Sequence, residues 1–445
     1  MIPVRLLASA ALLAAVALPT PATAAPAPAP TVAAGPTATS GTFSVLTYNV
    51  AGLPEPLSGS KPAVNTRPIG ERVNAYDIVH VQEDFNYHAD LYATDRHPYR
   101  TPTSGGVPFG SGLNTMSNHP YADFARVTWD RCNGTDCLTP KGFTASRIRL
   151  AEGVFVDFYN VHANAGSSEA DLAARRANLS QLSAYVGTHS AGNAVVVMGD
   201  LNVRYTRTGD TIRDLVAANG LTDAWVQQER GGVPPAAGSP ALTCDPANVT
   251  NACEVVDKIL YRSNRLVRLD LTRYHTEHAR FLDPAGEPLS DHYPHAAWFG
   301  WTLDAGLRAS DTWGGPHGIP FTDLPAVGPR VTGLTLRGGS RLDQVGVTLA
   351  DGRTLTHGGT GGTATALTLA ADEHVTEVTL TQGQRAGRTR IFSARLTTNH
   401  GRTLAAGTPT PAAVTFTAPP GGRLAGFFGR SGDEIDQLGV LWTLG

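Results

Sequence analysis

The stretch Ala194-Val195-Val196-Val197-Met198-Gly199-Asp200-Leu201-Asn202 is an apolar run that stops at polar residues. Its β-branched residues favour a buried strand, so Asp200 and Asn202 stand where that strand would end. The same plan recurs in four other runs, at residues 44–49, 78–83, 155–162 and 255–260. The sequence therefore predicts a sheet whose strands bring polar side chains to its edge.

Helical patterns lie between these runs. Ser168 is predicted to cap a helix that has Asp171 at its third position. One face of this helix carries Leu172, Leu179, Leu182 and Val186. A second short helix is predicted over residues 211–219, because Gly220 follows as a stop signal. Strands that alternate with helices predict a layered α/β domain over residues 42–302.

The sequence pattern changes in residues 308–445, where no helical periodicity is present. Short alternating runs are separated by Gly-rich turns, which predicts an all-β domain. The hexapeptide at residues 342–347 is echoed at residues 435–440. This echo predicts two matching hairpins and pseudo-symmetry among the sheets.

The composition excludes several classes of protein. A chain of 445 residues favours more than one domain. Only 16 % of residues are charged, whereas Gly (48) and Pro (31) are abundant, which excludes a coiled coil or a helical repeat. Hydrophobic residues make up 41 % and the formal net charge is −3, so disorder is not indicated.

The N-terminus predicts export. Residues 1–24 combine a positive start, an apolar run and a small-residue cleavage site, which is typical of a secretory signal peptide. Residues 25–41 are rich in Pro and Ala and predict a linker. The mature protein is therefore expected to be secreted.

The chain has four cysteines, an even number that suggests disulfides in an exported protein. Of the three possible pairings we favour the local one, which joins Cys132 to Cys137 and Cys244 to Cys253. A zinc site is the alternative, although neither pair has the spacing of a metal knuckle.

The polar residues at the strand ends form a candidate site. A single Asp or Asn after a strand is usually a turn former, but here four carboxylates, two His and two Asn recur in the same position. These residues are Asn49, Glu83, His162, Asp200, Asn202, Asp257, Asp291 and His292. Such a set suits Mg²⁺ or Mn²⁺ with an activated water molecule, and not a serine or thiol nucleophile.

Six motifs carry a resemblance to a known family. They are Thr47-Tyr48-Asn49-Val50, Val81-Gln82-Glu83, Asn160-Val161-His162, Gly199-Asp200-Leu201-Asn202, Val256-Asp257-Lys258-Ile259 and Ser290-Asp291-His292. In this order they resemble the motifs of the endonuclease/exonuclease/phosphatase superfamily, which includes deoxyribonuclease I and the sphingomyelinases. The resemblance implies a four-layer α/β sandwich and Mg²⁺-dependent cleavage of a phosphate ester.

The resemblance also implies a role for each residue. Glu83 would bind the metal beside Asn49, and Asp291 would complete its surroundings. His292 would take a proton from water, and Asp257 would orient His292. Asp200 would align the water, while Asn202 and His162 would bind or stabilise the phosphoryl group.

The substrate class is less constrained than the chemistry. The net charge gives no sign of the basic groove that would help a nuclease. Lys141, one of three lysines, begins a Lys-Gly step that resembles the sphingomyelinase branch and is a candidate phosphate contact. We therefore expect a phospholipid such as sphingomyelin, with peripheral membrane contact, ahead of a nucleic acid. The segment 274–289 that would hold a membrane-inserting hairpin offers only Tyr274, Phe281 and Leu282.

The C-terminal part resembles the jacalin-like lectins through Gly-rich turns and the loop Gly432-Asp433-Glu434-Ile435-Asp436. The resemblance implies a β-prism of three four-stranded sheets. It also implies that Asp436 accepts hydrogen bonds from a sugar, with Gly432, Asp433, Glu434 and Gly314 or Gly315 around it. A structural prism without sugar affinity is the alternative.

Together these features predict a secreted phosphodiesterase that a lectin module brings to glycosylated surfaces. One alternative is a secreted nuclease with the same metal site. Another is a carbohydrate-binding adhesin whose α/β domain is inactive. No protein partner is predicted.

Overall fold

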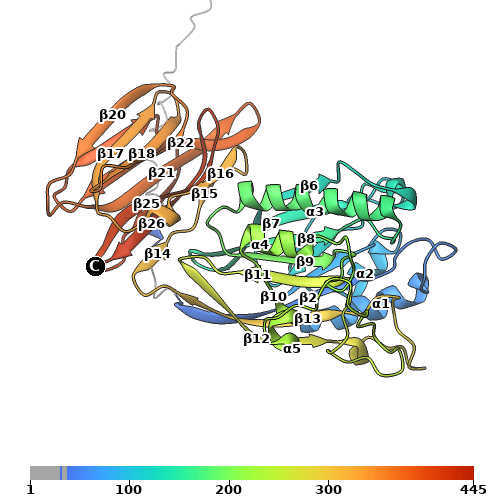
Figure 1. Ribbon diagram of the computed structural model, residues 1–445. Helices are drawn as coiled ribbons and strands as arrows, with labels where there is room; N and C mark the ends of the chain where they lie inside the picture. The colour runs from blue at the N-terminus through green and yellow to red at the C-terminus, as the bar shows by residue number, and fades with distance from the viewer. Residues whose placement is uncertain (1–30, 33–37) are drawn as a thin grey trace, which may run out of the picture.

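The computed structural model describes residues 31–32 and 38–445 of the chain. The N-terminal domain holds two six-stranded sheets packed face to face (Figure 1). The first sheet has the order β12 (Val267–Thr276), β13 (His295–Leu303), β2 (Ser40–Asn49), β3 (Ile78–Gln82), β5 (Asn114–Ser117) and β4 (Tyr99–Arg100). The second has the order β10 (Thr222–Asp223), β11 (Asp257–Arg262), β9 (Val195–Asp200), β8 (Val154–His162), β7 (Gly142–Ala151) and β6 (Tyr121–Thr128). Neighbouring strands are antiparallel except for the parallel pairs β2–β3 and β8–β9.

Helices cover the outer faces of the two sheets. They are α1 (Pro62–Arg72), α2 (His88–Thr94), α3 (Glu169–His189), α4 (Ile212–Asn219) and α5 (Ala224–Arg230). Short 3₁₀ helices cover Val73–Ala75, Gly134–Leu138, His278–Arg280 and Leu324–Ala326. Ser168 and Asp171 form the predicted capping box of α3, and Gly220 ends α4 with φ 60°. The four-layer α/β sandwich is confirmed.

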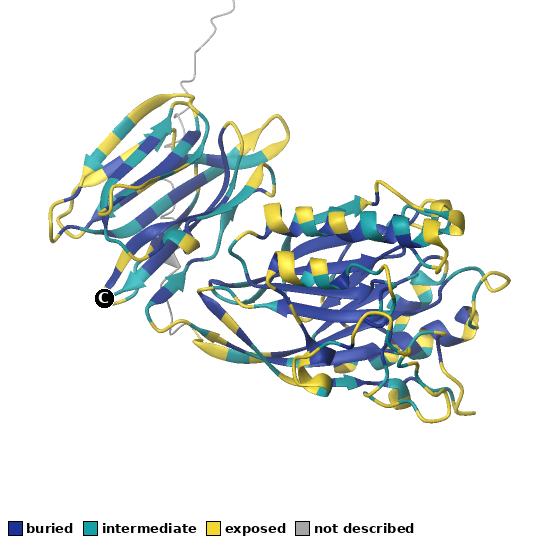
Figure 2. Ribbon diagram, viewed as in Figure 1, coloured by how far each residue is buried: buried dark blue, intermediate teal, exposed yellow. Residues whose placement is uncertain are grey.

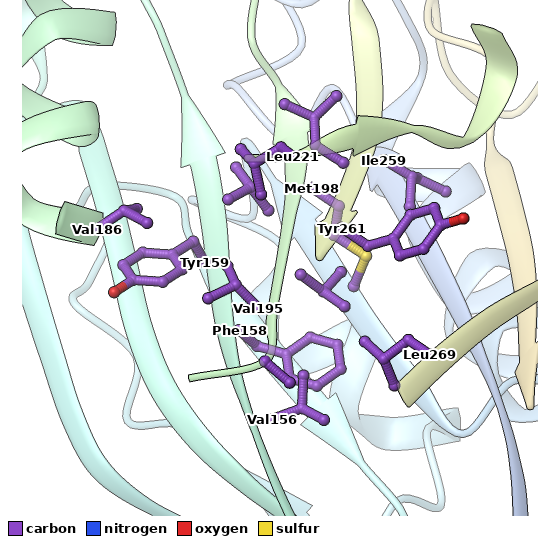
Figure 3. Packing of buried hydrophobic residues seen from close by; sticks show 14 of the residues in the cluster. Val156, Phe158, Tyr159, Val186, Val195, Met198, Leu221, Ile259, Tyr261 and Leu269 are labelled. Carbon is purple, nitrogen blue, oxygen red and sulfur yellow. The ribbon is translucent and has the colours of Figure 1, made fainter. Parts of the chain in front are cut away.

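The main core lies between the two sheets and beneath α3. Phe158 packs edge-on against Phe43 of the opposite sheet, whereas its neighbour Tyr159 packs against Tyr185 of α3. Figure 3 shows Tyr159 beside Val186 of α3, with Val195 and Met198 on the neighbouring strand. Every residue of β9 is buried, since this strand is covered on both faces. That double cover explains the unbroken apolar run of the sequence.

The C-terminal domain is the predicted β-prism of three sheets, but two of these sheets have five strands instead of four. One sheet has the order β14 (Leu307–Ala309), β26 (Ile435–Leu444), β25 (Gly422–Ser431) and β16 (Ile319–Thr322), with β15 (Trp313–Gly314) also on β26. The second has β19 (Thr354–Gly358), β18 (Leu342–Leu349), β17 (Val331–Gly338) and β20 (Thr363–Thr368). The third has β1 (Thr31–Val32), β24 (Ala412–Thr417), β21 (Val375–Arg385), β22 (Arg388–Thr398) and β23 (Thr403–Gly407). The echoed hexapeptides lie in β18 and β26, the second strands of two hairpins.

The two domains are joined by packed and charged contacts. Arg149 forms a bidentate pair with Asp311 at 2.7 and 2.8 Å, and Phe155 packs on Phe428. These contacts lie near the start of β8, and the C-terminal domain sits at the end of the sandwich away from α1 and α2 (Figure 1). Figure 2 shows the buried strands that continue from this junction through the sandwich. The other end of β8, at His162, is about 27 Å away along the strand.

The cysteines and the N-terminal segment were also subjects of sequence predictions. Both predicted disulfides are present, Cys132–Cys137 and Cys244–Cys253, so the zinc alternative is wrong. The predicted signal peptide at residues 1–24 lies outside the described residues. Most of the predicted linker at residues 25–41 also lies outside the described residues; within it, residues 31–32 pair with β24 and β2 begins at Ser40. Within the described residues, no helix is long and apolar enough to cross a membrane.

Candidate active site

The strand register gathers the predicted site residues at one edge of the sandwich. Parallel pairing sets His162 at the end of β8 beside Asp200 at the end of β9. Antiparallel pairing then sets Asp257, the first residue of β11, on the other side of Asp200. Asn49 ends β2 in the facing sheet, and Glu83 follows β3 directly. The two sheets therefore deliver their polar ends to a common site.

Asn49 connects the two sheets. Its Nδ2 donates to Glu83 Oε1 at 3.1 Å and to Asp200 Oδ2 at 3.2 Å. Its carbonyl oxygen accepts a hydrogen bond of 2.7 Å from Ser290 Oγ, which ties the loop containing His292 to the end of β2. The amide thus holds two carboxylates in place at the base of the site.

Two site residues have an unusual backbone conformation. Glu83 has φ 57° and Asn202 has φ 55°, a left-handed region that non-glycine residues seldom adopt. Such strain costs roughly 1–3 kcal/mol per residue and is found mainly at functional sites. The fold therefore supports this geometry at some cost in stability.

His292 and Asp257 form a dyad. His292 Nδ1 lies 3.0 Å from Asp257 Oδ2, and its Nε2 lies 3.7 Å from Asp200 Oδ2. Burial lowers the pKa of His292, but the carboxylates of Asp257 and Asp200 outweigh burial and hold it well above its ordinary value. The two carboxylates therefore stabilise the imidazolium form of His292, whose Nε2 edge is directed toward Asp200.

Asp200 lies among other carboxylates, and its pKa is raised. Burial, together with the charge of Asp257, raises the pKa of Asp200 to about 6 although His292 and Lys141 oppose this shift. Ligand atoms of Asp200, Asp257 and His292 all lie within 4.8 Å of one another. Glu83 adds a carboxylate, which Asn49 Nδ2 links to Asp200, while Asn49 Oδ1 accepts a hydrogen bond from the Ala51 amide. This donor set fits a hard divalent cation, which would neutralise the clustered carboxylates.

His162 is held as a neutral imidazole. It is buried, and its Nε2 accepts a hydrogen bond of 2.9 Å from Lys141 Nζ. Burial and the Lys141 charge place the pKa of His162 well below its ordinary value. Its carbonyl oxygen accepts a hydrogen bond from Trp129 Nε1. The Nε2 edge of His162 therefore lies between Lys141 Nζ and Asp200 Oδ2, which is 3.5 Å from Nε2.

Lys141 is positioned by a residue that the sequence reasoning missed. Asp136 Oδ1 lies 2.5 Å from Lys141 Nζ, and the other oxygen of Asp136 accepts from the Ala165 amide. Asp136 precedes Cys137, whose disulfide closes this loop. A carboxylate inside a disulfide loop five residues before a predicted functional lysine is the signal that could have found it.

Two other predicted residues lie less centrally. The Asn202 amide donates to Asp200 Oδ1 at 3.0 Å, and its Nδ2 donates to the Ala163 carbonyl at 3.1 Å. Asp291 is exposed, and its carboxylate lies against Gly59 and within 3.4 Å of Ser290 Oγ. Asn202 therefore shapes the Asp200 end of the site, whereas Asp291 lies at its rim.

A buried amide pair beneath the site was also missed. Gln82 Nε2 donates to Asn160 Oδ1 at 2.8 Å, and Asn160 Nδ2 donates to the carbonyls of Val81 and Asn114. These bonds cross from one sheet to the other. The signal was available, because Gln82 and Asn160 each lie in a motif that ends at a predicted site residue.

In the predicted sugar-binding loop, residues 432–436, the carboxylate of Asp436 is already paired with an arginine. Asp436 is buried, and its Oδ1 is paired with Arg390 at 2.6 Å. Arg390 also pairs with Glu434 at 2.6 Å, whereas Gly432 and Asp433 are exposed. The Gly315 amide donates to the Asp436 carbonyl, so this glycine does lie at the loop. A sugar hydroxyl that approached Asp436 would have to share this carboxylate with Arg390.

Phe281 and Tyr274, the aromatic residues of segment 274–289, are both buried. Phe281 packs edge-on against Tyr48, and Tyr274 stacks on His295. This segment therefore presents neither aromatic side chain to a membrane.

Comparisons with known proteins agree with this architecture. The endonuclease/exonuclease/phosphatase family 2 matches residues 61–229, and the jacalin-like lectin domain matches residues 310–441. A sphingomyelinase of Mycobacterium bovis is 44% identical over 274 residues, which cover 60% of this chain and 54% of that protein. The chain thus spans about half the length of that relative. Horcolin of Hordeum vulgare is 33% identical over 139 residues, which cover 29% of this chain and 93% of horcolin. Sphingomyelinase C from Streptomyces griseocarneus matches 58% of this chain and 99% of its own at 21% identity, with a TM-score of 0.42.

These matches define a two-domain protein with an endonuclease/exonuclease/phosphatase domain followed by a lectin-type β-prism. Through its C-terminal domain the chain belongs to the jacalin-like lectin family.

Proposed function

We propose that the N-terminal domain is a metal-dependent phosphodiesterase whose substrate is a phospholipid of the sphingomyelin type. The observation that carries this proposal is the His292–Asp257 dyad at 3.0 Å beside the carboxylates of Asp200 and Glu83. The 44% identity to a sphingomyelinase supports the substrate class.

The residues of the dyad move the proton. His292 Nε2 would accept a proton from the attacking water, while Asp257 stabilises the imidazolium through Nδ1. Asp200, 3.7 Å from Nε2, would align that water. Because burial raises the pKa of Asp200 to about 6, the charge of a bound cation would lower this pKa and favour the ionised carboxylate.

Glu83 and Asn49 would hold Mg²⁺ or Mn²⁺, with Asp291 at the rim of its surroundings. When bound, the ion supplies positive charge to the phosphoryl oxygens and the leaving oxygen. Lys141 and the neutral His162 would stabilise the same charge from the opposite side of Asp200, since they form a hydrogen-bonded pair at 2.9 Å. Asn202 would donate to a phosphoryl oxygen.

For the C-terminal domain we propose carbohydrate binding at the loop of Gly432 and Asp436, with Asp433, Glu434 and Gly315 around it. The 33% identity to horcolin over nearly its whole length supports this role. Two disulfides and the N-terminal signal pattern support export to an extracellular compartment.

A substrate panel tests the proposal. Purified protein is incubated with sphingomyelin, phosphatidylcholine and plasmid DNA, in Mg²⁺ or in chelator. We expect hydrolysis of sphingomyelin in Mg²⁺ and none in chelator. Hydrolysis of DNA alone would refute the lipid assignment in favour of the nuclease. Glycan binding without any hydrolysis would favour the adhesin.

A further inference from the structure

A cavity of about 420 Å³ opens beside the catalytic edge. Lys141 lines one end of it, and Lys141 Nζ is 2.9 Å from His162 Nε2. Apolar groups dominate the rest of the lining, including Pro108, Phe109, Trp129, Leu138 and Pro140. The lining thus combines a cation that contacts His162 with a mainly apolar remainder.

The lining of this cavity contains one cation, Lys141, and one carboxylate, Asp136, which contact each other at 2.5 Å. Beyond Lys141 the lining offers no cation to a second phosphate, as the backbone of a nucleic acid would require. A ligand that fits has an anionic group at Lys141 and an apolar group beyond it, which is the chemistry of a phospholipid.

Two side chains at the mouth of the cavity are strongly exposed. Phe109 is 82 % exposed and Leu138 is 64 % exposed. Large apolar groups that stand in water at the entrance of a site mark an interaction surface more often than isolated ones do. Leu57, 68 % exposed, lies on a third loop near the site.

The loops that carry these residues are tied down. Leu138 ends the 3₁₀ helix Gly134–Leu138, which the Cys132–Cys137 disulfide closes. The Phe109 loop is closed at its base, where the Ser111 amide donates to Ser104 Oγ at 2.9 Å. These contacts hold the backbone of both loops, so little backbone freedom is lost when their tips are covered.

Hydrogen bonds connect the loops of Leu57 and Phe109 to the chain around Glu83, the proposed metal ligand. The Gly52 amide donates to the Glu83 carbonyl, and the Asp84 amide donates to the Gly112 carbonyl, both at 3.0 Å. The loops of Leu57 and Phe109 therefore flank Glu83 directly. Leu57, Phe109 and Leu138, which we call the apolar rim, lie on three loops beside the catalytic edge.

We propose that the apolar rim docks on a phospholipid bilayer and that the cavity takes the hydrocarbon next to the scissile phosphate. This inference deepens the proposed function, on which it rests. It places the membrane contact on the loops of Phe109 and Leu138, since Phe281 and Tyr274 of segment 274–289 are buried.

Vesicle binding tests the proposal without turnover. Wild type and the double variant Phe109→Ser/Leu138→Ser are sedimented with phosphatidylcholine–sphingomyelin vesicles in chelator. The matched control is Val233→Ser/Ile319→Ser, which removes two side chains that are 70 % and 61 % exposed elsewhere. We expect roughly 10- to 100-fold weaker binding for the rim variant and wild-type binding for the control. Equal binding by all three proteins would overturn the proposal.

Kinetics separate docking from chemistry. With Mg²⁺, the rim variant should lose more activity on sphingomyelin vesicles than on soluble p-nitrophenylphosphocholine, because only the vesicle substrate requires docking. An equal loss on both substrates would overturn docking as the role of the rim, and so would a loss confined to plasmid DNA. If wild type hydrolyses neither lipid nor soluble ester, the proposed function fails, while the sedimentation result still decides the docking surface.

Discussion

The dyad makes the sharpest prediction, for Asp257→Asn. This change removes the carboxylate charge and keeps the size of a side chain that is 3 % exposed. The charge of Asp257 lies 3.0 Å from His292 Nδ1. At an effective dielectric constant of about 20, attraction across this distance is worth roughly 5 kcal/mol, or about four powers of ten.

That figure is an upper limit. Asp200 remains 3.7 Å from His292 Nε2 in the variant, and an Asn oxygen can still accept from Nδ1. General-base catalysis contributes about 10²- to 10⁴-fold. We therefore expect kcat to fall about 10²- to 10⁴-fold with little change in KM, because Asp257 acts on the base and not on substrate binding.

The assay is hydrolysis of sphingomyelin in detergent micelles with Mg²⁺. Circular dichroism during heating checks that the variant is folded, and Asp270→Asn, a change at a partly exposed carboxylate of β12, is the matched control. A folded Asp257→Asn protein that loses less than about tenfold in kcat would refute the role given to the dyad.

Three further predictions concern separate parts of the molecule. Lys141→Met should lower kcat about 10²-fold or more by removing the cation beside His162, whereas the exposed Lys61→Met should not; equal rates for both variants would contradict the assignment. Asp436→Asn should weaken glycan binding at least about tenfold and leave hydrolysis of a soluble ester unchanged; unaltered binding on a glycan array would remove this loop from the sugar site. A hydrogen bond from the Arg402 guanidinium, with a smaller contribution from the Thr398 hydroxyl, lowers the pKa of Glu373 from its ordinary 4.5 to about 2. Because this pKa is lowered in the folded protein, the stabilisation is present above pH 4.5 and is lost as the pH falls toward 2. Urea titrations should show that Glu373→Gln flattens this acid-induced fall, and an unchanged pH profile would argue against the ion pair.

Much of the catalytic domain could be predicted because the ends of its strands are marked in the sequence by polar residues after apolar runs. The run over residues 194–200 is apolar because β9 is covered on both faces, and its polar end is Asp200. Once several strands end in this way, sheet register brings His162 and Asp257 to the same place. Local patterns were enough for these residues because an apolar run predicts the strand and the polar residue after it predicts where the strand ends.

Contacts between distant loops could not be predicted in the same way. Nothing near Asp436 in the sequence indicates that Arg390 takes its carboxylate, because the two residues lie on different sheets of the prism. The exposure of Phe109 depends on how its loop closes at Ser104 and Ser111. The burial of Phe281 depends on its contact with Tyr48, more than two hundred residues away. Long-range packing, which no local pattern encodes, decides all three.

The central claim is that His292 is the base of a metal-dependent phospholipid phosphodiesterase. It is tested most directly by the initial rate of phosphocholine release from sphingomyelin, with Mg²⁺, by wild type and His292→Ala. His400→Ala, a change at a partly exposed imidazole of the C-terminal domain, is the matched control. We predict release by wild type and His400→Ala and loss of at least about 10²-fold for a folded His292→Ala protein. Release by folded His292→Ala at the wild-type rate would contradict the account.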